Sequence, residues 1–349
     1  MSDKTTAEGK SKLTYVGVDD GHYAVKVCLG NGAVYSFPSR AAQGKKVLDI
    51  DEGSNSSAFY QTEEGATFTV SEFLTNYEDT RFADYPKSPL NRVLIHHALL
   101  RAGLGGKNVA ITTGLPVSHY YLPGGQKNEA LIKGKIINLN RGVTSASAKM
   151  AKIVKSNVST EAISAYFDMI MNMDGSQSEH YEQLKEETVG VIDIGGKTTD
   201  CAVVHPGGQQ VDADRSGSFD VGLLNLNDTV SGLLRARYEL ENVPPRMVEQ
   251  AIRTGKVKIA GEQVTVADLV AVEKQRLVEK MISGVRTKIG NGKDLDSVIF
   301  VGGGSIVLRE QLTPLFKHGL FPEHPEFANA RGMYKIAKYI FGEDEANGE

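Results

Sequence analysis

Two stretches of this chain repeat one order of residues: a strand rich in β-branched side chains, an acid, a glycine turn and a second apolar strand. Val189 to Val204 reads VGVIDIGGKTTDCAVV, and Tyr15 to Leu29 reads YVGVDDGHYAVKVCL. Both returning strands carry a cysteine, and the leading acids, Asp19 and Asp193, lie about 174 positions apart. β-Branched runs that end at Asp and Gly favour strands, so each stretch predicts a β-hairpin. Two similar hairpins half a chain apart predict two related domains that face each other.

The residues at the two hairpin tips suit a nucleotide that carries a magnesium ion. Gly21 and the pair Gly195-Gly196 have no side chain, so their backbone N–H groups can approach an anion closely. A carboxylate beside such a turn does not favour phosphate itself, but it can hold the hydrated Mg²⁺ of a nucleotide. Asp19 and Asp193 are therefore the candidate Mg²⁺ partners, through water. The alternative is a pair of ordinary hairpins with turn-capping aspartates.

A third glycine-rich element follows an apolar strand nearer the C-terminus. Residues 298–305 read VIFVGGGS and precede an apolar run of helical character. A strand that passes through glycines into a helix is a common contact for a nucleotide. Gly302, Gly303, Gly304 and Ser305 are therefore candidates for contact with an anion or a nucleotide.

These three elements resemble the phosphate, phosphate and adenosine motifs of the actin-like ATPase superfamily. The matching residues are Asp19-Asp20-Gly21, Asp193 to Gly196 and Gly302 to Gly304. Two further blocks, IHHALL at residues 95–100 and GLPVSHYY at residues 114–121, resemble the ParM (StbA) family of plasmid-partitioning actins. The resemblance extends over roughly residues 13–341 and rests on these two blocks, because a lone DxGG would be unspecific.

The resemblance implies an α/β protein with the actin-like ATPase fold, in which two related RNase H-like α/β domains face a nucleotide cleft and each carries a smaller subdomain. Domain I would comprise residues 13–170 and 322–341, with an outer subdomain at roughly 33–90, and domain II residues 171–321. The resemblance also implies hydrolysis of Mg-ATP, with GTP left open, and polymerisation of the chain into filaments. These filaments would segregate plasmid DNA through a DNA-bound adaptor of the ParR type.

The same resemblance gives roles to individual residues. Glu161, in the segment STEAISAY, would hold the attacking water in line with the γ-phosphate, and Asp193 would take part in catalysis. The nucleotide contacts would be Asp19, Asp20, Gly21, His22, Tyr23, Lys26, Gly195, Gly196, Lys197, Thr198, Gly302, Gly303, Gly304 and Ser305.

Several of these residues have a second interpretation. Glu161 could belong to an ordinary helix start, and Lys26 could be a solvated strand lysine rather than a phosphate contact. Asp200 is either the second acid of the phosphate loop or a cross-strand hydrogen-bond partner. His22 and Lys197 stand where the family usually has smaller or hydroxyl residues, so their roles stay open, as does that of Tyr23, which departs from the family in the same way.

Composition bears on the partners and the compartment. The formal net charge is −4 without a basic block, so we expect no direct sequence-specific DNA binding and an adaptor between protein and DNA. The two cysteines lie in predicted strands, which indicates reduced thiols rather than a disulfide framework. No apolar run approaches the roughly 18 residues of a membrane span, and the N-terminus lacks a signal-peptide core. We therefore expect a cytoplasmic protein without membrane contact.

Local patterns predict the elements between the motifs. Residues 1–12 are expected to be a disordered leader and residues 342–349 an acidic, solvated tail. Helices are expected at residues 91–102, 160–171, 224–234, 266–289 and 332–341, and strands at 33–37, 66–71, 108–113 and 135–139. Residues 175–187 are expected to connect the two domains.

A rival function on the same fold is a non-polymerising sugar or acetate kinase. Such an enzyme needs an acidic base that faces an acceptor hydroxyl, and the sequence offers no convincing extra candidate. Because fold alone does not decide function, the preference for a filament-forming ATPase depends on the blocks at residues 95–100 and 114–121.

Overall fold

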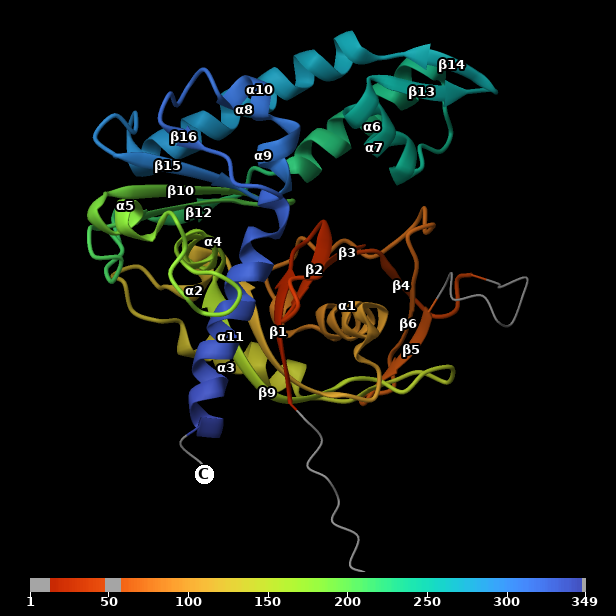
Figure 1. Cartoon of the computed structure of the whole chain (residues 1–349). Helices are drawn as coiled ribbons and strands as arrows, with labels where there is room; N and C mark the ends of the chain where they lie inside the picture. The colour runs from red at the N-terminus through yellow and green to blue at the C-terminus, as the bar shows by residue number, and fades with distance from the viewer. Residues whose placement is uncertain (1–12, 48–57, 347–349) are drawn as a thin grey trace, which may run out of the picture.

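The chain folds into two α/β halves, which lie one above the other in Figure 1. The computed structural model describes residues 13–47 and 58–346, so the leader expected at residues 1–12 lies outside the described residues. A mixed sheet forms the centre of each half, and in both sheets an antiparallel hairpin is extended by parallel strands. This internal duplication agrees with the two related domains that the repeated hairpins predict.

The sheet of the first half has the strand order β3-β2-β1-β7-β9. Its strands are β1 (Thr14–Asp20), β2 (Ala24–Leu29), β3 (Val34–Pro38), β7 (Asn108–Leu115) and β9 (Lys152–Thr160). Because side chains alternate along a strand, Val16 and Val18 face the core under α1 (Pro89–Leu99), whereas Gly17 faces α11 (Ala328–Ala346). A Cβ atom at Gly17 would lie 1.9 Å from the carbonyl oxygen of Ala330, so glycine permits α11 to approach the sheet.

The sheet of the second half has the order β12-β11-β10-β15-β16. Its strands are β10 (Val189–Ile194), β11 (Thr199–Val204), β12 (Gly217–Phe219), β15 (Ser297–Val301) and β16 (Gly319–Leu320). Helices α6 (Leu223–Tyr238) and α8 (Ala267–Ile289) cover one face, and α4 (Glu161–Ile170) covers the other. Burial on both faces explains why these strands read as continuous apolar runs rather than alternating ones.

Each half carries a smaller part at its outer end. In the first half, a small sheet has the order β4-β6-β5-β8, and in the second half a hairpin of β13 and β14 lies beside α7. Their bounds are β4 (Ala41–Gln43), β5 (Ala58–Thr62), β6 (Thr67–Val70), β8 (Val143–Thr144), β13 (Lys256–Ile259), β14 (Glu262–Thr265) and α7 (Pro245–Thr254). β3 belongs to the central sheet and β8 joins the small sheet from a distant segment. The domain boundaries given above stay a prediction.

The remaining elements are short or connect the two sheets. They are α2 (Val117–Tyr120), α3 (Glu129–Leu139), α5 (Tyr181–Glu186), α9 (Gly303–Val307), α10 (Arg309–Leu312) and the turns η1 (Tyr85–Lys87), η2 (Leu100–Leu104) and η3 (Pro325–Phe327). The expected connector at residues 175–187 contains α5. None of the helices in the described part of the chain is both long and apolar enough to cross a bilayer.

One local prediction is wrong, and others are confirmed with shifted ends. Residues 135–139 form the last turns of α3 rather than a strand, because the adjacent β-branched residues Ile136 and Ile137 imitate a strand pattern. The helix begins after Asn128, whose side chain accepts a hydrogen bond from the Leu131 N–H group. The expected helices correspond to α1, α4, α6, α8 and α11. α11 continues to residue 346, so the first part of the expected tail is helical.

Candidate functional site

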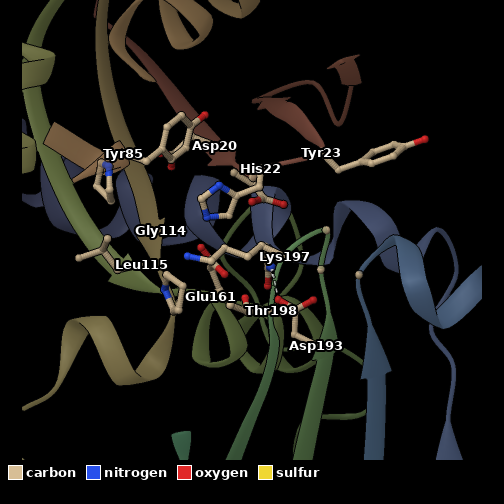
Figure 2. Close-up of a pocket in the computed structure, with 18 of the residues that line it drawn as sticks. Asp20, His22, Tyr23, Tyr85, Gly114, Leu115, Glu161, Asp193, Lys197 and Thr198 are labelled. Atoms are coloured by element: carbon tan, nitrogen blue, oxygen red, sulfur yellow. Dashed lines mark hydrogen bonds between the residues drawn. The ribbon is translucent and has the colours of Figure 1, made fainter. Parts of the chain in front are cut away.

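A cleft with an empty volume of about 830 Å³ lies between the two halves, at the tips of both hairpins. Figure 2 shows side chains from both halves pointing into it. The candidate residues that line it are Asp19, Asp20, Gly21, His22, Tyr23, Lys26, Glu161, Asp193, Gly195, Gly196, Lys197, Thr198, Gly302 and Gly303. The structure therefore brings residues together that are far apart in the sequence.

The first hairpin places Asp19 beside a lysine of its own. Asp19 is directly opposite Lys26 in the β1–β2 register, and the Lys26 Nζ atom lies 2.7 Å from the Asp19 Oδ2 atom. Burial alone would lower the pKa of Lys26, but Asp19, with Asp193 and Glu161, raises it. Lys26 is thus not a solvated strand lysine, since it lines the cleft as an ammonium held by carboxylates.

Asp20 points away from its neighbour into a buried polar network. The Lys135 Nζ atom lies 2.8 and 2.7 Å from its two oxygens, Asn91 donates a hydrogen bond of 2.7 Å, and the Thr113 hydroxyl donates another. Burial would raise the pKa of Asp20, but the Lys135 ammonium and these hydrogen bonds lower it. Lys135 also donates to the Gly114 carbonyl, so it joins the first hairpin to the strand beside it.

The sequence gives no sign of Lys135 as a site residue, because the pattern of residues 135–139 predicts a strand. Leu131, Lys135 and Leu139 share one face of a helix, being four residues apart. A lysine on the buried face of a helix needs a carboxylate partner. If the segment is read as a helix, the position of Lys135 between two leucines of its buried face is the signal that could have identified it.

The second hairpin places two acids opposite each other. Asp193 accepts a hydrogen bond of 2.6 Å from the Asn329 amide, and burial with the charge of Asp200 raises the pKa of Asp193 to about 7. Asp200 accepts hydrogen bonds from the Val117 N–H group at 2.9 Å, the Thr198 hydroxyl at 3.0 Å and the Ser218 hydroxyl. Burial raises the pKa of Asp200 despite these donors. Asn329, on α11, gave no signal in the sequence.

Glu161 is the first residue of α4 and lies over Gly114. A Cβ atom at Gly114 would lie 2.8 Å from the Glu161 Cγ atom, so glycine leaves room for this side chain. Burial, followed by the charges of Asp200, Asp19 and Asp193, raises the pKa of Glu161 well above its ordinary value. Among the described residues none donates a hydrogen bond to its carboxylate, which is free to accept one from water or a ligand.

The two hairpin tips touch each other across the cleft. A Cβ atom at Gly196 would lie 2.7 Å from the Tyr23 Cβ atom and 3.0 Å from its nitrogen, so the close approach requires glycine. The Tyr23 hydroxyl crosses the cleft and donates a hydrogen bond of 2.9 Å to Glu249. Burial lowers the pKa of His22 to about 4, with a further contribution from Lys197, so the imidazole is neutral at pH 7.

The third glycine element supports the cleft in two different ways. Gly302 and Gly303 line it, and Gly302 has a φ angle of 80°, where an added Cβ atom would lie 2.3 Å from the Asp193 Oδ1 atom. Gly304 and Ser305 lie behind the lining. The Ser305 hydroxyl donates a hydrogen bond of 2.7 Å to the Gly302 carbonyl, and Gly304 packs against Ile194.

Each half of the chain is similar to a different family model. Residues 14–172 match the profile of the plasmid segregation protein ParM, N-terminal part (StbA_N). Residues 191–314 match the C-terminal profile of the archaeal actin homologue MreB-like. No curated protein matches the chain in sequence.

Solved structures match over almost the whole chain. An archaeal actin homologue, Ta0583 in complex with ADP, has a TM-score of 0.73 at 20% identity and covers 94% of this chain and 99% of its own. A 15-stranded ParM filament from Clostridium botulinum has a TM-score of 0.74 at 19% identity, with 94% and 100% covered. Bacillus thuringiensis ParM with AMPPNP has a TM-score of 0.67 at 15% identity, with 95% and 99% covered.

The duplicated sheets, the shared cleft and both family profiles agree with one another. The structural matches establish the actin-like fold, and the N-terminal profile is that of ParM. The chain therefore has the actin-like fold, and it is similar to ParM in its N-terminal half and to an archaeal actin homologue in its C-terminal half.

Proposed function

We propose that the cleft binds and hydrolyses the Mg²⁺ complex of a nucleoside triphosphate, with ATP expected and GTP left open. The observation that carries this proposal is the meeting of two glycine hairpins, each led by an acid, Asp19 or Asp193, in one cleft beside an unpartnered Glu161. The neighbours solved with ADP and with AMPPNP support a nucleotide as the ligand.

The acids of the cleft fit a magnesium ion that is held through water. Their carboxylates are the hard oxygen donors that Mg²⁺ prefers, and Mg²⁺ usually keeps several waters and takes few protein ligands beside the phosphates. Burial, followed by the charges of Asp200 and Asp19, raises the pKa of Asp193 to about 7, and a divalent cation would offset the repulsion between these acids. When bound, the ion would neutralise charge on the phosphates.

The chain's own residues would bind the phosphates and position the water. Backbone N–H groups of Gly21 and Gly196 would face the phosphate oxygens, since no side chain obstructs them. The Gly195 N–H group already donates to the Thr198 carbonyl, so Gly195 would shape the turn rather than contact phosphate. Lys26 would add a cation from the first hairpin, while Gly302 and Gly303 would lie under the nucleoside. The Glu161 carboxylate would accept a hydrogen bond from the water and hold it in line with the terminal phosphate.

We further propose that nucleotide binding drives polymerisation and that hydrolysis destabilises the filament. A bound terminal phosphate would favour one angle between the halves, and a subunit interface can select that angle. The ParM filament among the structural neighbours and the ParM profile support this function. Segregation of plasmid DNA would follow through a DNA-bound adaptor of the ParR type in the cytoplasm, without direct sequence-specific DNA binding or membrane contact.

Light scattering combined with phosphate release tests this proposal. Scattering should rise on addition of Mg-ATP or Mg-GTP and later decay. Glu161→Ala should still polymerise but lose phosphate release by about 100-fold or more, so its scattering should persist. Glu129→Ala is the matched control, because Glu129 is also the first residue of a helix but is exposed and not part of the cleft lining.

Two outcomes would contradict parts of the proposal. Unchanged turnover in Glu161→Ala would remove Glu161 from its role. A flat scattering trace at every protein concentration, with nucleotide still bound, would favour the non-polymerising kinase.

A further inference from the structure

The cleft contains one cation that the protein does not neutralise. Lys26 is paired with Asp19 at 2.7 Å, and Lys135 is paired with Asp20 at 2.7 Å. Lys197 also lines the cleft, yet it has neither an ion pair nor a hydrogen bond with any other described residue. Within the described lining, this lysine is therefore the cationic side chain that remains for an anionic ligand.

The backbone that carries Lys197 is held rigidly. Gly195 donates a hydrogen bond of 2.9 Å to the Thr198 carbonyl, closing the turn around residue 197. The N–H groups of Leu223 and Leu224 donate to the Gly195 and Gly196 carbonyls at 3.0 and 2.8 Å. The tip is thus fixed to the start of α6, and only the Lys197 side chain is free to adjust.

The surroundings of Lys197 do not include a partner for its charge. Its side chain extends into the cleft toward His22 (Figure 2). Its charge contributes to the lowered pKa values of both His22 and His119, after burial, which places it among neutral imidazoles of the first half. A partly buried ammonium without a carboxylate is costly, and a bound anion would remove that cost.

We infer that Lys197 binds the terminal phosphate of the nucleoside triphosphate and so distinguishes a triphosphate from a diphosphate. This inference rests on the proposed nucleotide function. Lys197 directly follows Gly196, where the two hairpin tips meet at Tyr23, and it lines the same cleft as Gly302 and Gly303, the expected nucleoside contacts. A side chain there meets the far end of a phosphate chain held between the hairpins. An ammonium is a point charge that suits a non-bridging phosphate oxygen.

Equilibrium binding of AMPPNP and of ADP, each with Mg²⁺, tests the assignment. Lys197→Thr should weaken AMPPNP binding by about 10- to 100-fold, the loss of a charge-assisted hydrogen bond. It should change ADP binding by less than about threefold. Lys197→Arg should retain most of the AMPPNP affinity because it keeps the charge. Lys258→Thr is the control, since Lys258 is an exposed lysine of the β13 strand, outside the cleft.

The outcomes separate this inference from the function on which it rests. If the unaltered protein binds neither these adenine nucleotides nor their guanine counterparts, GMPPNP and GDP, both fail. If it binds both, and Lys197→Thr weakens AMPPNP and ADP equally or weakens neither, the assignment to the terminal phosphate is overturned while the nucleotide function stands. Without nucleotide, Lys197→Thr should unfold at a temperature no lower than that of the unaltered protein, because it removes a partly buried ammonium that no described residue pairs with.

Discussion

The two hairpins have the same shape but opposite arrangements of charge. In the β1–β2 hairpin the acid Asp19 stands directly across from Lys26, and in the β10–β11 hairpin Asp193 stands directly across from Asp200. Each partner lies seven residues after its acid, at the equivalent position of the repeat. Opposite charges across a strand pair stabilise it and like charges destabilise it. The same hairpin geometry therefore holds a stabilising pair in the first half and a destabilising pair in the second.

The difference shows where each half obtains its counter-charge. In the first half, lysines of the chain neutralise Asp19 and Asp20, and the pKa of Asp20 is lowered despite burial. In the second half no described lysine forms an ion pair with Asp193, whose pKa burial and the charge of Asp200 raise to about 7 although the charge of Lys26 lowers it. The first hairpin is therefore electrostatically complete, whereas the second is suited to a cation that arrives with the ligand.

The largest expected effect comes from removing the Lys135–Asp20 ion pair of the first half. Lys135→Met keeps the length of the side chain but leaves the Asp20 carboxylate buried without its ammonium. Removing one partner of a buried ion pair costs about 3–5 kcal/mol of the free energy of unfolding, measured by urea denaturation. Lys133→Met, on the exposed side of the same helix, should cost under about 0.5 kcal/mol. A loss below about 1 kcal/mol in Lys135→Met would contradict the view that the first half depends on this pair.

A smaller effect on the free energy of unfolding, of opposite sign, is expected at Asp193 in the second half. The folded-state pKa of Asp193, about 7, lies above its ordinary value of 3.8, so the folded form holds the proton more tightly. The stability that this group contributes is fully present below about pH 4 and is lost as the pH rises to about 7. Asp193→Asn should remove that loss and stabilise the ligand-free protein at neutral pH by on the order of 2 kcal/mol.

The matched control for the pH experiment is Asp20→Asn in the first hairpin. The folded-state pKa of Asp20 is lowered from its ordinary value of 3.8. The stability that its charge contributes is therefore fully present at pH values above about 4 and is lost as the pH falls through the lowered pKa. Asp20→Asn should therefore destabilise the protein at neutral pH, where Asp193→Asn stabilises it. Parallel curves of unfolding free energy against pH for the unaltered protein and Asp193→Asn would refute the proposed contrast.

The fold could be predicted from the sequence because its signals are local and repeated. Hairpins with glycine turns, the strand before Gly302 and the long apolar stripe of α8 each depend on neighbouring residues. The duplication then indicated that Asp19 and Asp193 would share a cleft, and the structure places both in its lining. The roles of the cleft residues stay predictions.

The polar partners of the cleft acids could not be predicted in the same way. Asn329 reaches Asp193 from the last helix, and Lys135 reaches Asp20 from a helix that the sequence pattern presents as a strand. Both contacts join segments more than a hundred residues apart, and no spacing rule relates them. Only the packing of α3 and α11 against the first sheet brings these side chains to the acids.

The smallest expected effect on the free energy of unfolding comes from the hydrogen bond that Tyr23, at the tip of the first hairpin, makes to the second half. Tyr23 and Lys197 each lie four residues after their acid, but Tyr23 has a partner, Glu249, in the opposite half at 2.9 Å. Tyr23→Phe removes one hydrogen bond that closes the cleft while Arg40 keeps its ion pair with Glu249. We expect a loss of about 0.5–1.5 kcal/mol in the free energy of unfolding, and none for the control Tyr35→Phe, which is 37% exposed. If Tyr23→Phe is as stable as the unaltered protein, the hydroxyl contributes nothing to holding the halves together, and Gly196 packing alone would account for the contact between the tips.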